Sequence, residues 1–124
     1  NISINADNQT LITMVDTHEN DNYSSQMIEL IKSAAFDRWL RSLRDRRATA
    51  RIQARLDRLA NGNPGDVKAV GGWISEMRID YGPGYRVYYM QRGPIFVILL
   101  SGGDKSSQQS DIAKAKEIAA QWKD

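Results

Sequence analysis

Four side chains in the second half of the chain have the chemistry to hold and react with a phosphate group: Arg78, Arg86, Tyr88 and Lys105. The two arginine forks suit paired contacts with phosphate oxygens. Lys105 supplies a point charge, and it can act as a base if neighbouring cations depress its pKa. Tyr88 suits stacking on a base, or proton exchange if cations lower its pKa. We therefore predict a compact cationic surface for a phosphate-bearing ligand.

Structural alternatives exist for the same residues. Arg78 can pair with Glu76 or Asp80 across neighbouring strands instead of binding a ligand. Lys105 can cap a loop or bind a carboxylate. Asp104, beside it, is a weaker acid or base candidate, and we expect its side chain to shape its own turn by bonding to the backbone.

Other kinds of reactive site find little support in the composition. The chain has no cysteine, which excludes disulfides and thiolate metal sites and is typical of a cytoplasmic protein. Its single histidine, His18, lies in a polar segment and is interpreted as a bystander. We expect neither a metal nor a cofactor. The run Gly102-Gly103-Asp104-Lys105 is interpreted as a tight loop, and its spacing does not match a phosphate-binding P-loop.

Three strands are expected to position the four side chains, at about 73–81, 85–91 and 95–101. Gly82-Pro83-Gly84 and Arg92-Gly93-Pro94 are short turn signals between them, so the strands should form an antiparallel meander. The alternation of side chains places Arg78, Arg86 and Tyr88 on one open face, opposite the helices. It directs four other residues toward the core: Met77, Ile79, Val87 and Tyr89. The third strand is apolar on both faces, which predicts a central position.

Helices and one more strand complete the expected order β-α-α-β-β-β-α. A first strand is predicted at 27–31, and Ser33 should cap a helix with apolar residues at helical spacing: Phe36, Trp39, Leu40 and Leu43. A second helix should span about 46–60 and end at Asn61-Gly62. Asp111 should cap or start a final helix, with four residues facing inward: Ile112, Ala115, Ala119 and Trp122. The predicted fold class is α+β, with a helical hairpin packed on a small, mainly antiparallel sheet.

Arginines are concentrated on the second predicted helix. We interpret four of them, together with Arg92, as candidate RNA contacts: Arg46, Arg47, Arg51 and Arg55. The alternative is a solvated helix face on which Asp45 and Asp57 provide local pairing.

Composition changes sharply at Met27. Residues 1–26 contain four acids and no Lys or Arg, whereas residues 27–124 hold all 17 Lys and Arg with the other 11 acids, a net charge of +6. A basic body of this kind favours a polyanionic partner. We interpret 1–26 as an extension, mostly flexible or a remnant of an expression vector or upstream read-through, although 10–15 can add a strand to a sheet edge. The longest apolar run, 95–100, is too short to span a membrane.

The ordered segments FDRWLRSLRDRRATARIQARLDRLANGNPGDVKAVGG, SEMRIDYGPGYRVYY and LLSGGDKSSQQSDIAKAKEIA resemble the HigB-like branch of the RelE/ParE toxin superfamily. The resemblance covers 27–124, the whole basic body. It implies a toxin that is neutralised by a small helix-turn-helix antitoxin, and DNA contact only through that antitoxin. Trp73 departs from the pattern, because a small residue, usually glycine, is expected after Gly71-Gly72.

The resemblance implies a ribosome-dependent mRNA endoribonuclease that inhibits translation. In this reaction a ribose 2′-OH attacks the adjacent phosphate without a metal, and the products are a 2′,3′-cyclic phosphate and a free 5′-OH. The catalytic candidates for this reaction are the four phosphate-directed residues described first. Two alternatives stay open: a ParE-like inhibitor of DNA gyrase, which shares the fold, and a degenerate toxin that retains only antitoxin binding.

Overall fold

The computed structural model describes residues 9–12 and 27–122, with side chains for the second range. The chain forms an α+β domain whose elements follow this order: β1 (Gln9–Ile12), β2 (Glu29–Ser33), α1 (Ala34–Ser42), α2 (Arg46–Ala60), β3 (Val67–Ala69), β4 (Ser75–Ile79), β5 (Tyr85–Arg92), β6 (Phe96–Asp104), the 3₁₀ turn η1 (Lys105–Ser107) and α3 (Gln108–Gln121). Within the described residues, none of the helices combines the length and the apolar character that crossing a bilayer requires.

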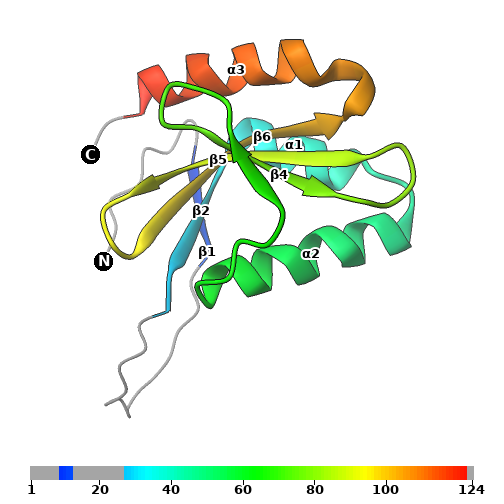
Figure 1. The fold of residues 1–124 in the computed structure, drawn as a ribbon, viewed down its shortest axis with the longest axis horizontal. Coiled ribbons are helices and arrows are strands. Elements are labelled where there is room, and N and C mark those ends of the chain that lie inside the picture. The colour runs from blue at the N-terminus through cyan, green and yellow to red at the C-terminus, as the bar shows by residue number, and fades with distance from the viewer. Residues whose placement is uncertain (1–8, 13–26, 123–124) are drawn as a thin grey trace.

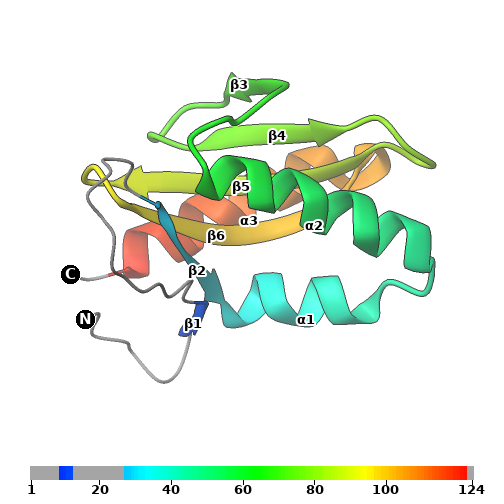
Figure 2. The same cartoon turned by 90° about the horizontal axis from the view of Figure 1, so that it is seen from below.

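A six-stranded mixed sheet forms the middle layer, with the strand order β1-β2-β6-β5-β4-β3. The β2–β6 pair is parallel, and the other four pairs are antiparallel. The predicted meander of β4, β5 and β6 is confirmed, and so is the central position of β6, which is paired on both sides. Figures 1 and 2 show α1 and α2 on one face of the sheet and α3 on the other.

The helical hairpin covers the first core. Ser33 caps α1 as predicted, because its hydroxyl accepts a hydrogen bond from the Phe36 amide and thereby satisfies an amide that has no partner within the helix. The predicted bounds of α2 are confirmed, and Asn61 is its C-cap. Apolar side chains from one face of each helix pack on the sheet, among them Phe36, Leu40, Ile52, Leu56, Met77, Val87 and Tyr89. The core-facing set predicted from strand alternation is therefore confirmed.

A second core lies beneath α3, on the face of the sheet that was expected to be open. It contains Ile74, Tyr88, Met90, Leu100 and Ala115, with Ile112, Ala119 and Trp122 packed against its margin. The predicted inward face of the last helix is confirmed, although α3 begins at Gln108, ahead of Asp111. The prediction of an open face is wrong at Tyr88, because sequence alternation separates the two faces of a strand but does not say which element covers each.

Other differences from the predicted elements are local. The first predicted strand lies two residues later, as β2, and the short β3 was not predicted. Gly102 and Gly103 belong to β6, so the prediction of a tight loop there is wrong. A Cβ atom at Gly102 would overlap the Trp39 ring, and one at Gly103 would overlap Asp111 and Ser107. The two glycines therefore allow α1 and α3 to approach opposite faces of one strand.

The predicted edge strand is confirmed in part. Gln9–Ile12 pairs with β2 at one edge of the sheet, and the remainder of the predicted segment 10–15 lies outside the described residues. The predicted flexibility of the extension and the place of His18 also fall outside the described residues.

Candidate nucleic-acid interface

Two arginines lie directly opposite each other on β4 and β5, where Arg78 is the register partner of Arg86. Like charges in this arrangement destabilise a strand pair. Arg78 is compensated by an ion pair with Asp66, in which Nη2 lies 2.8 Å from the carboxylate. Among the described residues Arg86 makes neither an ion pair nor a side-chain hydrogen bond, and its buried Nε has no partner. Within residues 27–122 the two arginines each have a buried Nε without a partner, but only Arg78 has an ion-pair partner, and Asp66 attracts Arg86 from a greater distance.

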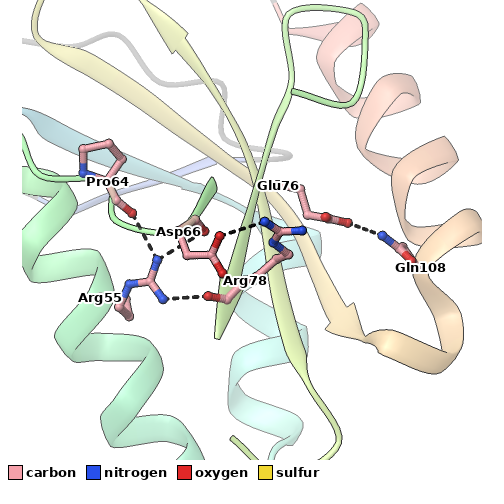
Figure 3. A network of polar contacts seen from close by, with 6 residues as sticks. All are labelled: Arg55, Pro64, Asp66, Glu76, Arg78 and Gln108. Carbon is pink, nitrogen blue, oxygen red and sulfur yellow. Dashed lines mark hydrogen bonds and ion pairs between the residues drawn. The ribbon is translucent and has the colours of Figure 1, made fainter. Parts of the chain in front are cut away.

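The Asp66–Arg78 ion pair belongs to a network that fastens β4 to the end of α2 (Figure 3). The Arg55 guanidinium donates to three backbone carbonyls, those of Arg78 (2.6 Å), Pro64 (3.1 Å) and Asp66 (3.4 Å). Burial lowers the pKa of Arg55, whereas the hydrogen bond from Arg78 lowers the pKa of Asp66. Arg55 was predicted to contact RNA, and the structure instead engages its donors in holding the segment that leads into β3.

Tyr88 is fully buried between the sheet and α3. Its hydroxyl donates a 3.0 Å hydrogen bond to Glu76, a buried carboxylate that also accepts 2.6 Å from Gln108 Nε2. Burial, followed by the hydrogen bond to Glu76, raises the pKa of Tyr88 well above its ordinary value. The expectation of a cation-lowered pKa is therefore wrong, and stacking on a base is incompatible with this burial.

Glu76 is a polar residue of this region that the sequence did not single out. It is 0% exposed, and its Oε1 has no partner among the described residues. A buried carboxylate is stable only where donors surround it. Here the donors come from β5 and from the first turn of α3, so Glu76 joins three elements. Its position on the face of Arg78 was visible from strand alternation, but the helix that buries it was not.

Lys105 is exposed and follows β6 directly, in η1. Its neighbour Asp104 caps this turn by accepting hydrogen bonds from the Ser106 amide and hydroxyl, which confirms the predicted turn-shaping role. The same hydrogen bonds lower the pKa of Asp104. A Cβ atom at Gly84 would lie 3.5 Å from Lys105 Cβ, so Lys105 stands beside the β4–β5 turn.

The beginning of α2 brings further cations to the same end of the molecule, at the right in Figure 1. Arg46 and Arg47 are exposed in its first turn, which contains no acidic residue. Cations are disfavoured at a helix N-terminus because the helix dipole is positive there. Arg51 Cζ lies 4.8 Å from the centre of the Tyr81 ring, and the Tyr81 hydroxyl donates to Asp45, the N-cap of α2. These contacts join the start of α2 to the β4–β5 hairpin.

Arg92 does not join this group. It lies at the other end of β5, opposite Phe96, and lines a separate hollow. The predicted site residues are therefore divided: Arg46, Arg47, Arg51, Arg86 and Lys105 lie toward one end with Arg78, whereas Arg92 lies at the other. In the described part of the chain no group of three or more His, Cys, Asp or Glu side chains is arranged to hold a metal ion.

Comparison with known proteins gives one relative of this chain. A Haemophilus influenzae protein, named only as an uncharacterized protein, is 50% identical over 92 residues, which cover 74% of this chain and 93% of that protein. No family model matches the chain. No solved structure matches it.

Proposed function

This chain belongs to the same protein family as the Haemophilus influenzae relative, and we propose that it is a ribosome-dependent mRNA endoribonuclease, the toxin of a type II toxin–antitoxin system. The proposal includes a HigB-like form of the RelE/ParE fold. It also includes two kinds of partner, the ribosome with its mRNA and a small helix-turn-helix antitoxin. The described order of elements, with a helical hairpin on one face of a mainly antiparallel sheet, supports the fold that the proposal requires.

The Arg86 guanidinium, which has no ion-pair partner among the described residues, is the observation that carries the proposal. Arg86 faces Arg78 across two strands, and its buried Nε–H has no acceptor among the described residues. Leaving a buried donor without a partner costs about 1–3 kcal/mol. A phosphate bound over the two strands would pair with the guanidinium of Arg86 and offset the repulsion between the two guanidinium groups, although the buried Nε itself lies out of its reach. This arrangement fits a surface whose electrostatic balance is completed by an anionic ligand.

The proposed reaction is an in-line transfer within the RNA backbone. The ribose O2′ forms a bond to phosphorus, the bond from phosphorus to the 5′ oxygen of the next nucleotide breaks, and the 2′-OH proton is transferred overall to that leaving oxygen. Negative charge accumulates on the non-bridging oxygens as the phosphorane forms. Fixed cations at this position lower the barrier because they interact more strongly with the transition state than with the ground state.

The roles assigned to individual residues follow their surroundings. Arg86 is the main ligand of the phosphorane, and Arg78 joins it when Asp66 releases part of its guanidinium. Exposed Lys105 carries a second positive charge to the same end of the sheet and is the candidate for proton transfer. Tyr88 has no role in the reaction and stabilises the fold, because its hydroxyl is hydrogen-bonded to buried Glu76.

RNA beyond the reacting phosphate is assigned to the start of α2. Arg46, Arg47 and Arg51 are exposed there, and Figure 1 shows that the start of α2 lies at the same end of the molecule as the β4–β5 turn. Charges of this kind contribute affinity that is independent of base sequence and falls with salt.

The test is cleavage of a translated message in a cell-free system, with and without ribosomes. We expect cleavage only with ribosomes, products that end in a 2′,3′-cyclic phosphate, and about 100-fold slower cleavage by Arg86→Ala. Arg58→Ala, which removes an exposed arginine from α2, is the matched control and should cleave normally. Intact message together with blocked gyrase supercoiling would contradict the proposal in favour of a gyrase inhibitor.

Antitoxin binding is tested separately. Co-expression with a small helix-turn-helix antitoxin of the proposed kind should relieve growth arrest and give a complex that co-purifies. If growth arrest persisted and no complex formed, the toxin–antitoxin assignment would be rejected. The result of the cleavage assay would not be affected.

A further inference from the structure

The β3–β4 hairpin turns through a position that tryptophan rarely occupies. The Ile74 amide donates a 3.0 Å hydrogen bond to the Gly71 carbonyl, and the two residues between them have positive φ angles, 63° for Gly72 and 65° for Trp73. Two positive φ angles are the signature of a type I′ turn, whose second central position strongly favours glycine. In the described chain Trp73 is the only non-glycine residue with a positive φ.

Burial in a core does not explain why a tryptophan occupies this position. Its side chain is 92% exposed, so the indole ring gains little from burial to offset a strained backbone. Residues with a strained backbone conformation cluster at active sites and ligand-binding sites. The combination indicates that the turn presents the indole ring to a ligand.

A hollow of about 680 Å³ opens beside the indole ring. Met90, Ala119 and Ala120 contribute apolar lining, and the charged side chains that line it, Arg92 and Lys116, are both basic. A Cβ atom at Gly71 would lie 3.5 Å from Lys116 Nζ, so this ammonium group stands over the backbone of the turn. The hollow therefore combines an exposed aromatic surface with positive charge.

We propose that this hollow binds an unpaired nucleotide of single-stranded RNA, with its base stacked on Trp73 and its phosphate held by Lys116. Unpaired bases are recognised by stacking on aromatic side chains, while basic residues follow the backbone. The inference takes its ligand class from the proposed function. It adds a second contact on the RNA, apart from the reacting phosphate.

Strand geometry relates this hollow to the arginine pair. Trp73 lies two residues before β4, and Arg78 follows it by five residues, which is at most about 17 Å along the chain. The two positions are close enough for one RNA strand to contact both, but the RNA must pass outside β4, because Glu76 is buried beneath α3 between them. Nucleotides on one side of the reacting phosphate would reach the hollow between α3 and the β3–β4 turn.

A nucleotide fits these features better than an acidic peptide does. Protein interfaces bury their tryptophans centrally, inside a rim of contacts that excludes water. Trp73 instead stands at the tip of a hairpin. The other large hydrophobic side chains exposed in the described chain are Met27 and Ile95, which lie in other segments. A single stacked base needs one aromatic surface and one cation.

The experiment measures equilibrium binding of a fluorescent oligoadenylate to the free protein over a range of salt concentrations. Trp73→Gly should weaken binding about 5- to 100-fold, whereas Trp73→Phe should retain most of the affinity. Lys116→Ala should reduce the salt slope by about one, and Lys114→Ala, an exposed lysine on the same helix, should reduce it less. A duplex RNA of the same length should show no dependence on Trp73.

Unchanged oligoadenylate affinity in Trp73→Gly, with an unchanged or higher melting temperature, would overturn the inference. Polyglutamate serves as an acidic peptide probe. If Trp73→Gly lost binding to polyglutamate while its binding to oligoadenylate stayed unchanged, the inference would be overturned in favour of an acidic protein partner. The outcome is separable from that of the proposed nuclease function, which is judged by the effect of Arg86→Ala on message cleavage. If the protein did not cleave message but still required Trp73 to bind oligoadenylate, the RNA site would be supported and the nuclease proposal would be rejected.

Discussion

Arg55 donates a 2.6 Å hydrogen bond to the backbone carbonyl of Arg78, so a side chain from α2 holds the strand that carries one of the two facing arginines. The same guanidinium also reaches the carbonyls of Pro64 and Asp66, which precede β3. One cation thus reinforces the junction between β4 and the segment 64–66, which is also joined by a 3.0 Å hydrogen bond from the Arg78 amide to the Asp66 carbonyl. Arg55 supports the arrangement of the arginine pair without belonging to it.

Arg55→Ala should therefore lower the free energy of unfolding by roughly 1–3 kcal/mol, because several backbone carbonyls lose a charged donor. Arg58→Ala removes a fully exposed arginine one turn along α2 and should change stability by less than about 0.5 kcal/mol. Urea denaturation of both variants compares them directly. Equal stabilities for the two variants would mean that the contacts of Arg55 are replaced by water at no cost.

Tyr88→Phe should destabilise the fold by about 1–3 kcal/mol while leaving RNA cleavage by the folded protein close to normal. The substitution keeps the buried ring and removes one of the donors to buried Glu76. Urea denaturation and cleavage rates measured at low temperature separate the two effects. Large loss of cleavage with full stability would restore Tyr88 to a direct role in the reaction.

The stability difference between wild type and Tyr88→Phe should also depend on pH. The pKa of Tyr88 is raised in the folded protein, chiefly by burial and then by the hydrogen bond to Glu76. A raised pKa stabilises the fold fully below the ordinary tyrosine value of 10.0, and this contribution is lost as the pH rises toward the folded-state pKa. The difference between the two proteins should therefore shrink above pH 10. A constant difference from pH 8 to pH 11 would contradict this assignment.

Asp66→Asn should strengthen binding to RNA, because it removes the carboxylate that pairs with Arg78 at 2.8 Å. A released Arg78 can neutralise one more phosphate, so the slope of log affinity against log salt should steepen by about 0.7 for single-stranded RNA. Asp80→Asn makes the same change of charge at an exposed position two residues beyond Arg78 and is the matched control. Equal effects of the two substitutions would indicate general charge attraction without a specific release of Arg78.

Local signals in the sequence predicted the helices and the meander well. Ser33 and Asn61 are capping residues whose effect depends only on their neighbours, so the start of α1 and the end of α2 followed from them. The shared sheet face of Arg78 and Arg86 likewise followed from alternation and from the short turn between β4 and β5, although their direct opposition did not. These features are determined by residues close to each other in the chain.

The remaining features depend on contacts between distant segments. Glu76 and Gln108 are 32 residues apart, and their hydrogen bond depends on where α3 crosses the sheet. From the sequence alone, Arg55 is consistent with a solvated helix face. In the fold, the chain returns alongside it at Asp66, whose carbonyl accepts a hydrogen bond from Arg55. Helical and strand periodicity assigns a residue to a face of its own element, but tertiary packing decides what that face meets.

Gly102→Ala should destabilise the fold by about 1–3 kcal/mol, because its Cβ would overlap the indole ring of Trp39. The glycine is needed here for space, since its φ lies outside the left-handed region. Trp39→Leu should relieve the overlap, so the double variant should be more stable than the sum of the single effects predicts. Additive effects in thermal denaturation would mean that the two residues do not meet in this way.

Trp73→Gly should raise stability by about 0.5–1 kcal/mol, even though it removes a large side chain. A left-handed conformation costs a non-glycine residue about 1–2 kcal/mol, and the added chain entropy of glycine in the unfolded state offsets only part of that relief. Because the indole ring is 92% exposed, little buried area is lost. Trp73→Ala keeps the strain and is the control, and it should not be stabilised. A fall in melting temperature for Trp73→Gly would show that the indole ring stabilises the β3–β4 turn, and the strain would then no longer require a ligand to explain it.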